Sequence, residues 1–227
     1  PALAAALGLA LGAAGQWPAL RHVVGRTRAG QHVASGPALD DQRSTRALLR
    51  WIQGSTSPGA AVLAAWDQGH AIEWAAERAS VATNFGSYVG EEGYLAPWRF
   101  FLEEDPTAAE ALLGERDARY VLILGSFSKD LEVMLRLVRP DERRELVEAS
   151  PDGPRPTARW YRTMAARLML TGKVGDPSTG ELGGDSLGFL RLVHVSPEPL
   201  ALPMAIPHTT GAVPAGWVWE RVPGAVV

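Results

Sequence analysis

The sequence predicts a mixed α/β fold, with helices around a small central sheet and a strand-containing C-terminal tail rich in Gly and Pro. Two apolar runs of strand length, 60–65 and 118–124, are each followed by a segment with helical features. Strands that alternate with helices favour an α/β core. The chain has 227 residues, of which 46% are hydrophobic, and this is enough to bury one sizeable core.

The N-terminal segment, residues 1–16, is mostly apolar and carries no charged side chain. It is shorter than the roughly 20 residues that span a bilayer as a helix. Its residues alone are compatible with the core of a signal peptide, the end of a transmembrane helix, or a buried Ala/Leu-rich helix. Residues 17–40 are rich in Gly, Arg and small polar side chains and are predicted to form a linker.

We predict a central core domain over 41–174 and a strand-rich part of the same domain over 175–227. The core domain begins with apolar residues at helical spacing, which Asp40 or Asp41 would cap and Gly54 would end. The residues with this spacing are Thr45, Leu48, Leu49 and Ile52.

Further along the chain, Asp105 followed by Pro106 marks a helix start, because Asp is a favoured N-cap and Pro is favoured at the first helical position. That helix is expected to end at Gly114. Three other helices are predicted, over 70–78, from Ser126 or Ser128 to Val138, and over 158–170. The C-terminal part is predicted to contain strands over 189–195 and 217–222.

Composition excludes several classes of function. The formal net charge is −3 and no run of Lys or Arg occurs, which argues against a nucleic-acid partner. With no cysteine, the chain has neither disulfides nor thiolate metal sites. Its five histidines lack ligand spacing, and no phosphate-binding or nucleophile motif is present. The acidic clusters 91–92 and 103–105 are expected to be solvated loop charge.

One polar segment follows the first apolar run directly. It reads Trp66-Asp67-Gln68-Gly69-His70 and is followed by a short amphipathic stretch and a polar turn, 83–86. Binding residues are often found on loops just past a strand, where a rigid scaffold holds them. The residues alone also allow a simpler interpretation, in which Asp67 caps a helix and Trp66 packs in the core.

This segment resembles the peptide-acceptor signature of the oligosaccharyltransferase catalytic subunit, bacterial or archaeal type, in its C-terminal extracytoplasmic domain. The signature in that family is typically Trp-Trp-Asp-Tyr-Gly, followed by a helix with an Arg and an Asn-rich turn. Here Ala65 stands in place of the first Trp and Gln68 in place of the Tyr. The resemblance covers most of residues 42–227, and its other segments are 118–121, 160–162, 191–194 and 223–225.

The resemblance implies that Trp66, Asp67 and Gly69 bind the acceptor peptide, and that Trp66 and Asp67 hold the hydroxyl of the Ser or Thr two residues after the acceptor Asn. A carboxylate accepts a hydrogen bond from a hydroxyl, and a missing partner is costly in a buried site. It also implies that Met134 and Leu137, at i and i+3 of a helix, contact the methyl group of an acceptor Thr. An ordinary amphipathic helix with Met134 as core filler is the alternative.

The resemblance further implies a membrane-anchored oligosaccharyltransferase whose C-terminal domain lies on the extracytoplasmic, periplasmic side. Such an enzyme transfers a lipid-linked glycan to Asn of an acceptor polypeptide with a divalent metal, Mn or Mg. Its metal ligands and catalytic residues are expected outside this chain, in a membrane domain that also binds the lipid-linked oligosaccharide. Residues 1–16 are then best explained as the end of a transmembrane helix, and the isolated chain is expected to be inactive.

Two alternatives remain. Ala65 and Gln68 are compatible with a membrane glycosyltransferase of the same architecture that modifies something other than sequon peptides. A non-enzymatic extracytoplasmic binding domain, tethered by its apolar N-terminus, is the second.

Overall fold

The computed structural model describes residues 37–84, 86–125, 131–148, 155–170, 187–197 and 214–222. By its internal contacts the chain divides into two units, 1–40 and 41–227. The predicted apolar segment and most of the predicted linker lie outside the described residues. The larger unit contains the described sheet and the segment 66–70 that was singled out in the sequence.

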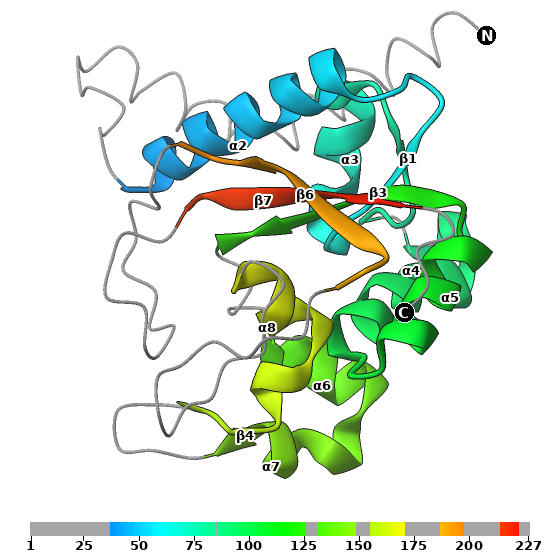
Figure 1. Ribbon diagram of the computed structural model, residues 1–227, viewed down its shortest axis with the longest axis vertical. Coiled ribbons are helices and arrows are strands. Elements are labelled where there is room, and N and C mark those ends of the chain that lie inside the picture. The colour runs from blue at the N-terminus through cyan, green and yellow to red at the C-terminus, as the bar shows by residue number, and fades with distance from the viewer. Residues whose placement is uncertain are drawn as a thin grey trace, which may run out of the picture. The chain divides into compact units, whose positions relative to one another are not determined.

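A five-stranded mixed sheet forms the centre of this unit. Its strands are β1 (Ala61–Leu63), β2 (Ala79–Ser80), β3 (Ala118–Leu124), β6 (Leu190–Val195) and β7 (Gly216–Arg221). The strand order is β2-β1-β3-β7-β6 (Figure 1). β1 pairs in parallel with β2 and β3, whereas β7 pairs antiparallel with β3 and β6. The predicted α/β fold class is therefore confirmed, and the four predicted strands are all present.

The helices are α2 (Pro37–Ser55), η1 (Trp66–Gln68), α3 (Gly69–Ala71), η2 (Ile72–Ala76), α4 (Gly86–Leu102), α5 (Pro106–Glu115), α6 (Leu131–Val138), η4 (Pro140–Glu142), α7 (Arg143–Leu146), η5 (Trp160–Arg162) and α8 (Met164–Met169). A small hairpin pairs β4 (Val147–Glu148) with β5 (Arg155–Pro156). Asp105 caps α5 as predicted, its side chain accepting from the Thr107 amide.

Three predicted helices needed correction. Because α2 begins at Pro37, Asp40 and Asp41 lie inside this helix and do not cap it. The helix predicted over 158–170 is two short helices, since the extended backbone of Thr163 ends η5 and its hydroxyl caps α8. The helix predicted over 70–78 is α-helical in α3 and a π-helix in η2, ends at Ala76, and follows directly on the 3-10 turn η1.

Successive residues of each central strand point to opposite faces of the sheet, and helices cover both faces (Figure 1). In β7, Trp217 and Trp219 enter one core cluster and Val218 enters the other. The first cluster includes residues of α4, α5 and α8, and the second includes residues of α2 and η2. A strand that is covered on both faces is expected to be a continuous apolar run, as β3 is.

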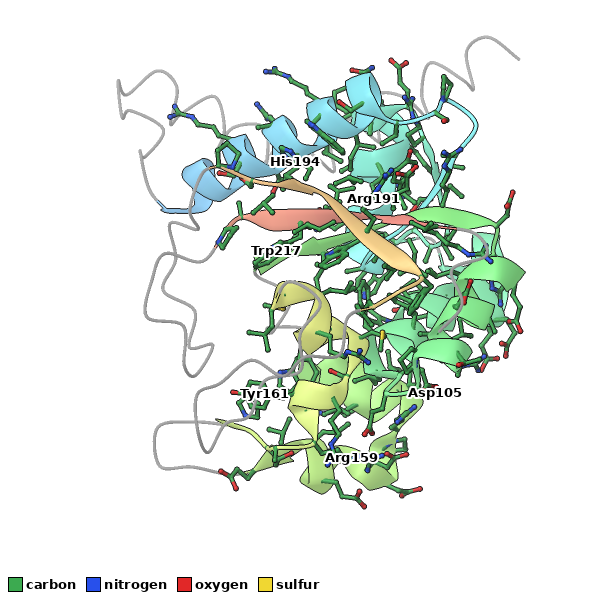
Figure 2. The ribbon with its side chains drawn as sticks, in the orientation of Figure 1. Asp105, Arg159, Tyr161, Arg191, His194 and Trp217 are labelled. Carbon is green, nitrogen blue, oxygen red and sulfur yellow. The ribbon has the colours of Figure 1, made fainter. Side chains whose placement is uncertain are left out.

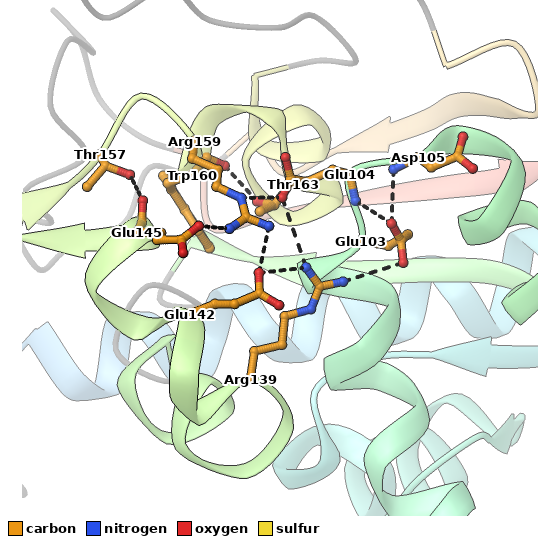
Figure 3. A network of polar contacts seen from close by, with 10 residues as sticks. All are labelled: Glu103, Glu104, Asp105, Arg139, Glu142, Glu145, Thr157, Arg159, Trp160 and Thr163. Atoms are coloured by element: carbon orange, nitrogen blue, oxygen red, sulfur yellow. Dashed lines mark hydrogen bonds and ion pairs between the residues drawn. The ribbon is translucent and has the colours of Figure 1, made fainter.

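A network of ion pairs joins three helical segments on the side of the first cluster (Figure 3). Arg159 of the turn before α8 contacts Glu104 at 2.7 Å and Glu142 at 2.6 Å, and it also pairs with Glu145. Arg139, which follows α6, lies 3.5 Å from both Glu103 and Glu142. Hydrogen bonding to Glu104 raises the pKa of Arg159.

This network corrects one expectation from the sequence. The acidic cluster 103–105 is not solvated loop charge: Glu103 and Glu104 are about three-quarters buried and paired with arginines, and Asp105 caps a helix. Ion pairs that form a network in this way have a more restricted geometry than single surface ion pairs. Single surface pairs contribute little to stability.

On the opposite face, the Trp51 ring of α2 stacks on the His194 imidazole of β6, with centroids 4.4 Å apart and planes at 15°. Figure 2 shows His194 on the strand below this helix. Burial lowers the pKa of His194 below its usual value, because the stacked, partly covered site disfavours the charged imidazolium.

We predict that His194 makes the domain less stable in mild acid. Its pKa is lower in the folded than in the unfolded state, so the unfolded chain binds more protons once the pH falls below about 6.5. The free energy of unfolding should therefore fall as the pH decreases through this window. In the His194→Phe variant, which keeps an aromatic ring against Trp51, that part of the decrease should disappear. Urea unfolding at pH 7.5, 6.5 and 5.5 measures both slopes, and equal slopes would contradict the prediction.

Candidate functional site

The segment with Trp66 and Asp67 lies at one edge of the central sheet. Because β1 and β3 are parallel, with Leu63 opposite Val121, their carboxyl ends point to the same edge. η1 begins three residues after β1, and the chain that leaves β3 leads to α6. In sheets of parallel strands, ligands bind outside the carboxyl ends of the strands. This edge is therefore the candidate site.

Asp67 lies at the surface of the candidate site and its carboxylate is exposed. One of its oxygens, Oδ2, accepts a hydrogen bond of 2.9 Å from the Gln68 side-chain amide. The residues that cap η1 and α3 are Ala65 and Gln68, neither of which uses its side chain for capping. The interpretation of Asp67 as a helix cap is therefore wrong.

Trp66 is half-buried beside Asp67. Its ring lies 5.9 Å from that of Tyr94 on α4, with the planes tilted by 47°, and it packs on the first core cluster. Ala65, in the position of the family's first Trp, is buried in the same cluster. The surface of the site therefore carries one indole next to one carboxylate.

Gly69 has a steric role that the sequence did not reveal. Its backbone is helical, so no unusual φ angle requires a glycine. A Cβ atom at this position would lie 2.1 Å from the Ala82 carbonyl oxygen and 2.7 Å from the Thr83 Cα. Backbone atoms cannot yield as the end of a flexible side chain can. The polar turn after β2 therefore approaches the candidate site only because residue 69 has no side chain.

Arg78 is the second residue that shapes the site, and it is only 6% exposed. Its guanidinium donates to the Gln53 carbonyl at 2.6 Å, to the Thr56 carbonyl at 2.7 Å and to the Thr56 hydroxyl at 2.9 Å, all at the end of α2. It also donates to the carbonyls of Ala76 and Glu77, where η2 ends. These bonds attach the end of η2 to the end of α2.

The two residues predicted on the second helix, Met134 and Leu137, both lie on α6. Leu137 is 46% exposed, whereas its neighbour Leu135 is fully buried. The side chain of Met134 is outside the described part of the structure. α6 packs against α4, which also supplies Tyr94 to the candidate site. That Leu137 and Asp67 contact one ligand stays a prediction.

In the part of the chain that the structure describes, no helix has the length and apolar character needed to cross a membrane. Among the same residues, no three His, Asp or Glu side chains are grouped so that they could hold a metal ion.

The fold and part of the sequence match known proteins. Residues 43–127 match the family model of the AglB core domain. The structure is similar to the C-terminal globular domain of an oligosaccharyltransferase from Archaeoglobus fulgidus, with 17% identity, a TM-score of 0.52, and coverage of 79% of this chain and 97% of that chain. The resemblance found in the sequence is thus confirmed: residues 43–127 match the AglB core domain, and the fold is that of AglB C-terminal globular domains.

Longer archaeal proteins share this fold. The A. fulgidus AglB in complex with an inhibitory peptide and a dolichol-phosphate has 16% identity and a TM-score of 0.61, with coverage of 99% of this chain and 36% of that chain. The A. fulgidus oligosaccharyltransferase complex with Zn and sulfate has 15% identity and a TM-score of 0.59, with coverage of 78% and 35%. The chain therefore spans about a third of the length of these proteins. No curated protein matches it by sequence.

We predict that Gly69→Ala destabilises the domain by about 1–3 kcal/mol, because the new methyl group must displace the backbone of the 82–83 turn. Gly54→Ala is the matched control. Gly54 lies in α2, and a Cβ there would meet nothing within 4 Å. This change should be neutral or stabilise by up to about 1 kcal/mol, since alanine has the better helix propensity. Thermal unfolding of the two variants measures the contrast, and equal melting temperatures would show that the close approach at Gly69 has no energetic weight.

Proposed function

We propose that this chain is the acceptor-binding, C-terminal domain of a membrane oligosaccharyltransferase, on the extracytoplasmic side. The observation that carries the proposal is the exposed Asp67 carboxylate beside the half-buried Trp66 indole, at the carboxyl edge of β1 and β3, within the residues that match the AglB core domain. The whole protein would transfer a glycan from a lipid carrier to the side-chain amide of Asn.

The chemistry of this pair suits a hydroxyl ligand. A carboxylate has about four lone-pair sites, and the Gln68 amide uses one of them. The remaining sites can accept from the Ser or Thr two residues after the acceptor Asn. A site that hydrogen-bonds a hydroxyl rejects analogues without it more strongly than an apolar pocket does, because a desolvated carboxylate would be left unpaired.

The proposal extends to partners and cofactor. An acceptor polypeptide and a lipid-linked oligosaccharide are the proposed substrates, supported by the peptide and dolichol-phosphate bound to the A. fulgidus AglB. A divalent metal, Mn or Mg, is proposed for the whole enzyme, since a relative's crystal structure holds Zn. The described residues of this chain do not fit a metal site, so we propose that the ligands lie elsewhere in the protein. The chain's own part is to bind and orient the acceptor.

One observation favours a second candidate function. The Gln68 amide, at the position of the family's Tyr, donates to the carboxylate that would hold the hydroxyl, and the buried Ala65 provides no second indole. A weaker grip on the hydroxyl would suit a membrane glycosyltransferase of the same architecture with a different acceptor. The two functions differ in whether glycan transfer depends on the Ser or Thr hydroxyl of the peptide.

We predict that, in the full-length enzyme, Asp67→Ala lowers kcat/KM for a peptide with the Asn-x-Thr sequence by about 10- to 150-fold. This corresponds to the roughly 1.5–3 kcal/mol of a hydrogen bond to a charged group. Met134→Ala, which would remove only the apolar contact proposed for this residue, should cost less than about tenfold. Glycan transfer from a lipid-linked donor to a labelled peptide measures both effects.

The control is the same peptide with Thr replaced by Ala. If Asp67 holds the hydroxyl, the additional loss from Asp67→Ala should vanish with this peptide, giving a coupled cycle between enzyme and substrate. Additive losses would mean that Asp67 does not contact the hydroxyl, and the second candidate function would then be favoured. The isolated chain should transfer no glycan in either case.

A further inference from the structure

Trp74 in η2 is an exposed aromatic residue that the proposed function does not use. Its side chain is 86% exposed, the most of any large hydrophobic residue among those described, while Leu137 and Val195 follow at 46% and 38%. Indoles are among the side chains with most to gain from burial, and they are enriched where proteins bind other proteins. An indole this exposed is available to a partner, although a single exposed apolar residue does not by itself require one.

Trp74 projects from the same face of the polypeptide as Asp67. The buried residues of this segment are Ala65, Gly69, Ile72 and Ala76, which recur every three to four residues along one face. Asp67 and Trp74 are seven residues apart, about two helical turns, and both are exposed on the other face. A ligand that contacts the Asp67 carboxylate and continues along this face meets the Trp74 indole next.

The backbone around Trp74 has an uncommon conformation, which hydrogen bonds from Arg78 stabilise. η2 is a π-helix, a form that is rare and is enriched at functional sites. It ends at Glu77, a non-glycine residue with φ of 52° in the left-handed region. Such a residue persists only where its surroundings fix it. Here the fixing contacts come from Arg78, which binds the carbonyls of Ala76 and Glu77.

The charge around Trp74 indicates the kind of side chain that it would contact. Between Trp66 and Glu77 the chain has three acidic residues, Asp67, Glu73 and Glu77, all exposed, and no Lys or Arg. His70 is the only other titratable side chain in this segment, 4.0 Å from Glu73. The face of an indole attracts a cation, preferably a guanidinium, and neighbouring carboxylates strengthen that preference.

We propose that Trp74 is a specificity-determining residue that packs against an Arg or Lys side chain of the acceptor polypeptide. This inference rests on the proposed function. Seven residues of helix span about 10 Å, and an extended peptide advances about 3.3 Å per residue. The basic residue therefore lies within about four residues of the hydroxyl-bearing Ser or Thr. Such a contact adds selectivity that the single carboxylate of Asp67 does not provide.

The test uses the full-length protein and a set of Asn-x-Thr peptides, each with one Arg placed at a different position within four residues of the Thr. Each is compared with a peptide that has Gln at the same position. At one or two positions, Arg should raise kcat/KM by about twofold to fivefold over Gln, as expected for an exposed cation–π contact. The preference should disappear in Trp74→Ala and be largely kept in Trp74→Phe.

Each of the other possible results contradicts either the proposed function or the role proposed for Trp74. If the unmodified enzyme transfers no glycan to any peptide, the proposed function fails and this inference fails with it. If it transfers glycan but does not distinguish Arg from Gln, or keeps the preference in Trp74→Ala, only the role of Trp74 is wrong. A Trp74→Ala variant that loses activity equally with every peptide would show that the indole packs on another part of the enzyme. A third peptide series has Leu at the same positions, and a preference for Leu over Arg would show an apolar contact and contradict the cationic one.

Discussion

The structure depends on the central position of β3. This strand is hydrogen-bonded along both edges, to β1 on one side and β7 on the other, and helices cover both of its faces. Each buried residue of β3 is therefore in contact with one of two separate layers: Ala118, Val121 and Ile123 with the first cluster, and Tyr120 and Leu122 with the second. Apart from Tyr120, whose hydroxyl donates to Glu220 at 3.2 Å, these buried positions are apolar, since a polar side chain there would need a partner.

The geometry of the candidate site follows from the same strand. Because β3 is parallel to β1, the chain leaves both strands at one edge, and the segments that begin with Trp66 and lead to α6 start there. Two residues then fix the shape of that edge. Gly69 lets the 82–83 turn approach the helical segment, and Arg78 attaches the end of η2 to α2. Gly69 and Arg78 can position the proposed ligand-binding residues without contacting a ligand themselves.

Local patterns predicted the features that local interactions determine. The apolar run of β3 and the Asp105 cap of α5 were found from their own neighbours in sequence, and both are present. The features that were not predicted depend on residues distant in sequence. Arg78 binds a carbonyl 25 residues away, and Arg159 pairs with a carboxylate 55 residues away. α4 was not predicted because it is broken at Gly90 and contains Pro97, two residues that normally end a helix.

The same reasoning explains what the motif at the candidate site could and could not indicate. The order Trp-Asp-x-Gly located the edge of the sheet correctly, since a strand followed by a polar turn is a local pattern. It could not show that Ala65 faces the core or that the Gln68 amide would bind the Asp67 carboxylate, because both depend on how the short helix η1 is oriented.

That orientation also bears on selectivity. An exposed carboxylate is solvated in the free protein, and a hydroxyl that replaces water there gains little. It gains more where the peptide, together with Trp66 and Tyr94, excludes water from Asp67, because an unsatisfied carboxylate then becomes costly. If the chain has the proposed function, selection for the hydroxyl would therefore depend on how much of the acceptor peptide covers this face of the segment. In the role that we propose for it, Trp74 would hold the peptide beyond the hydroxyl and would contribute to that selection without contacting the hydroxyl itself.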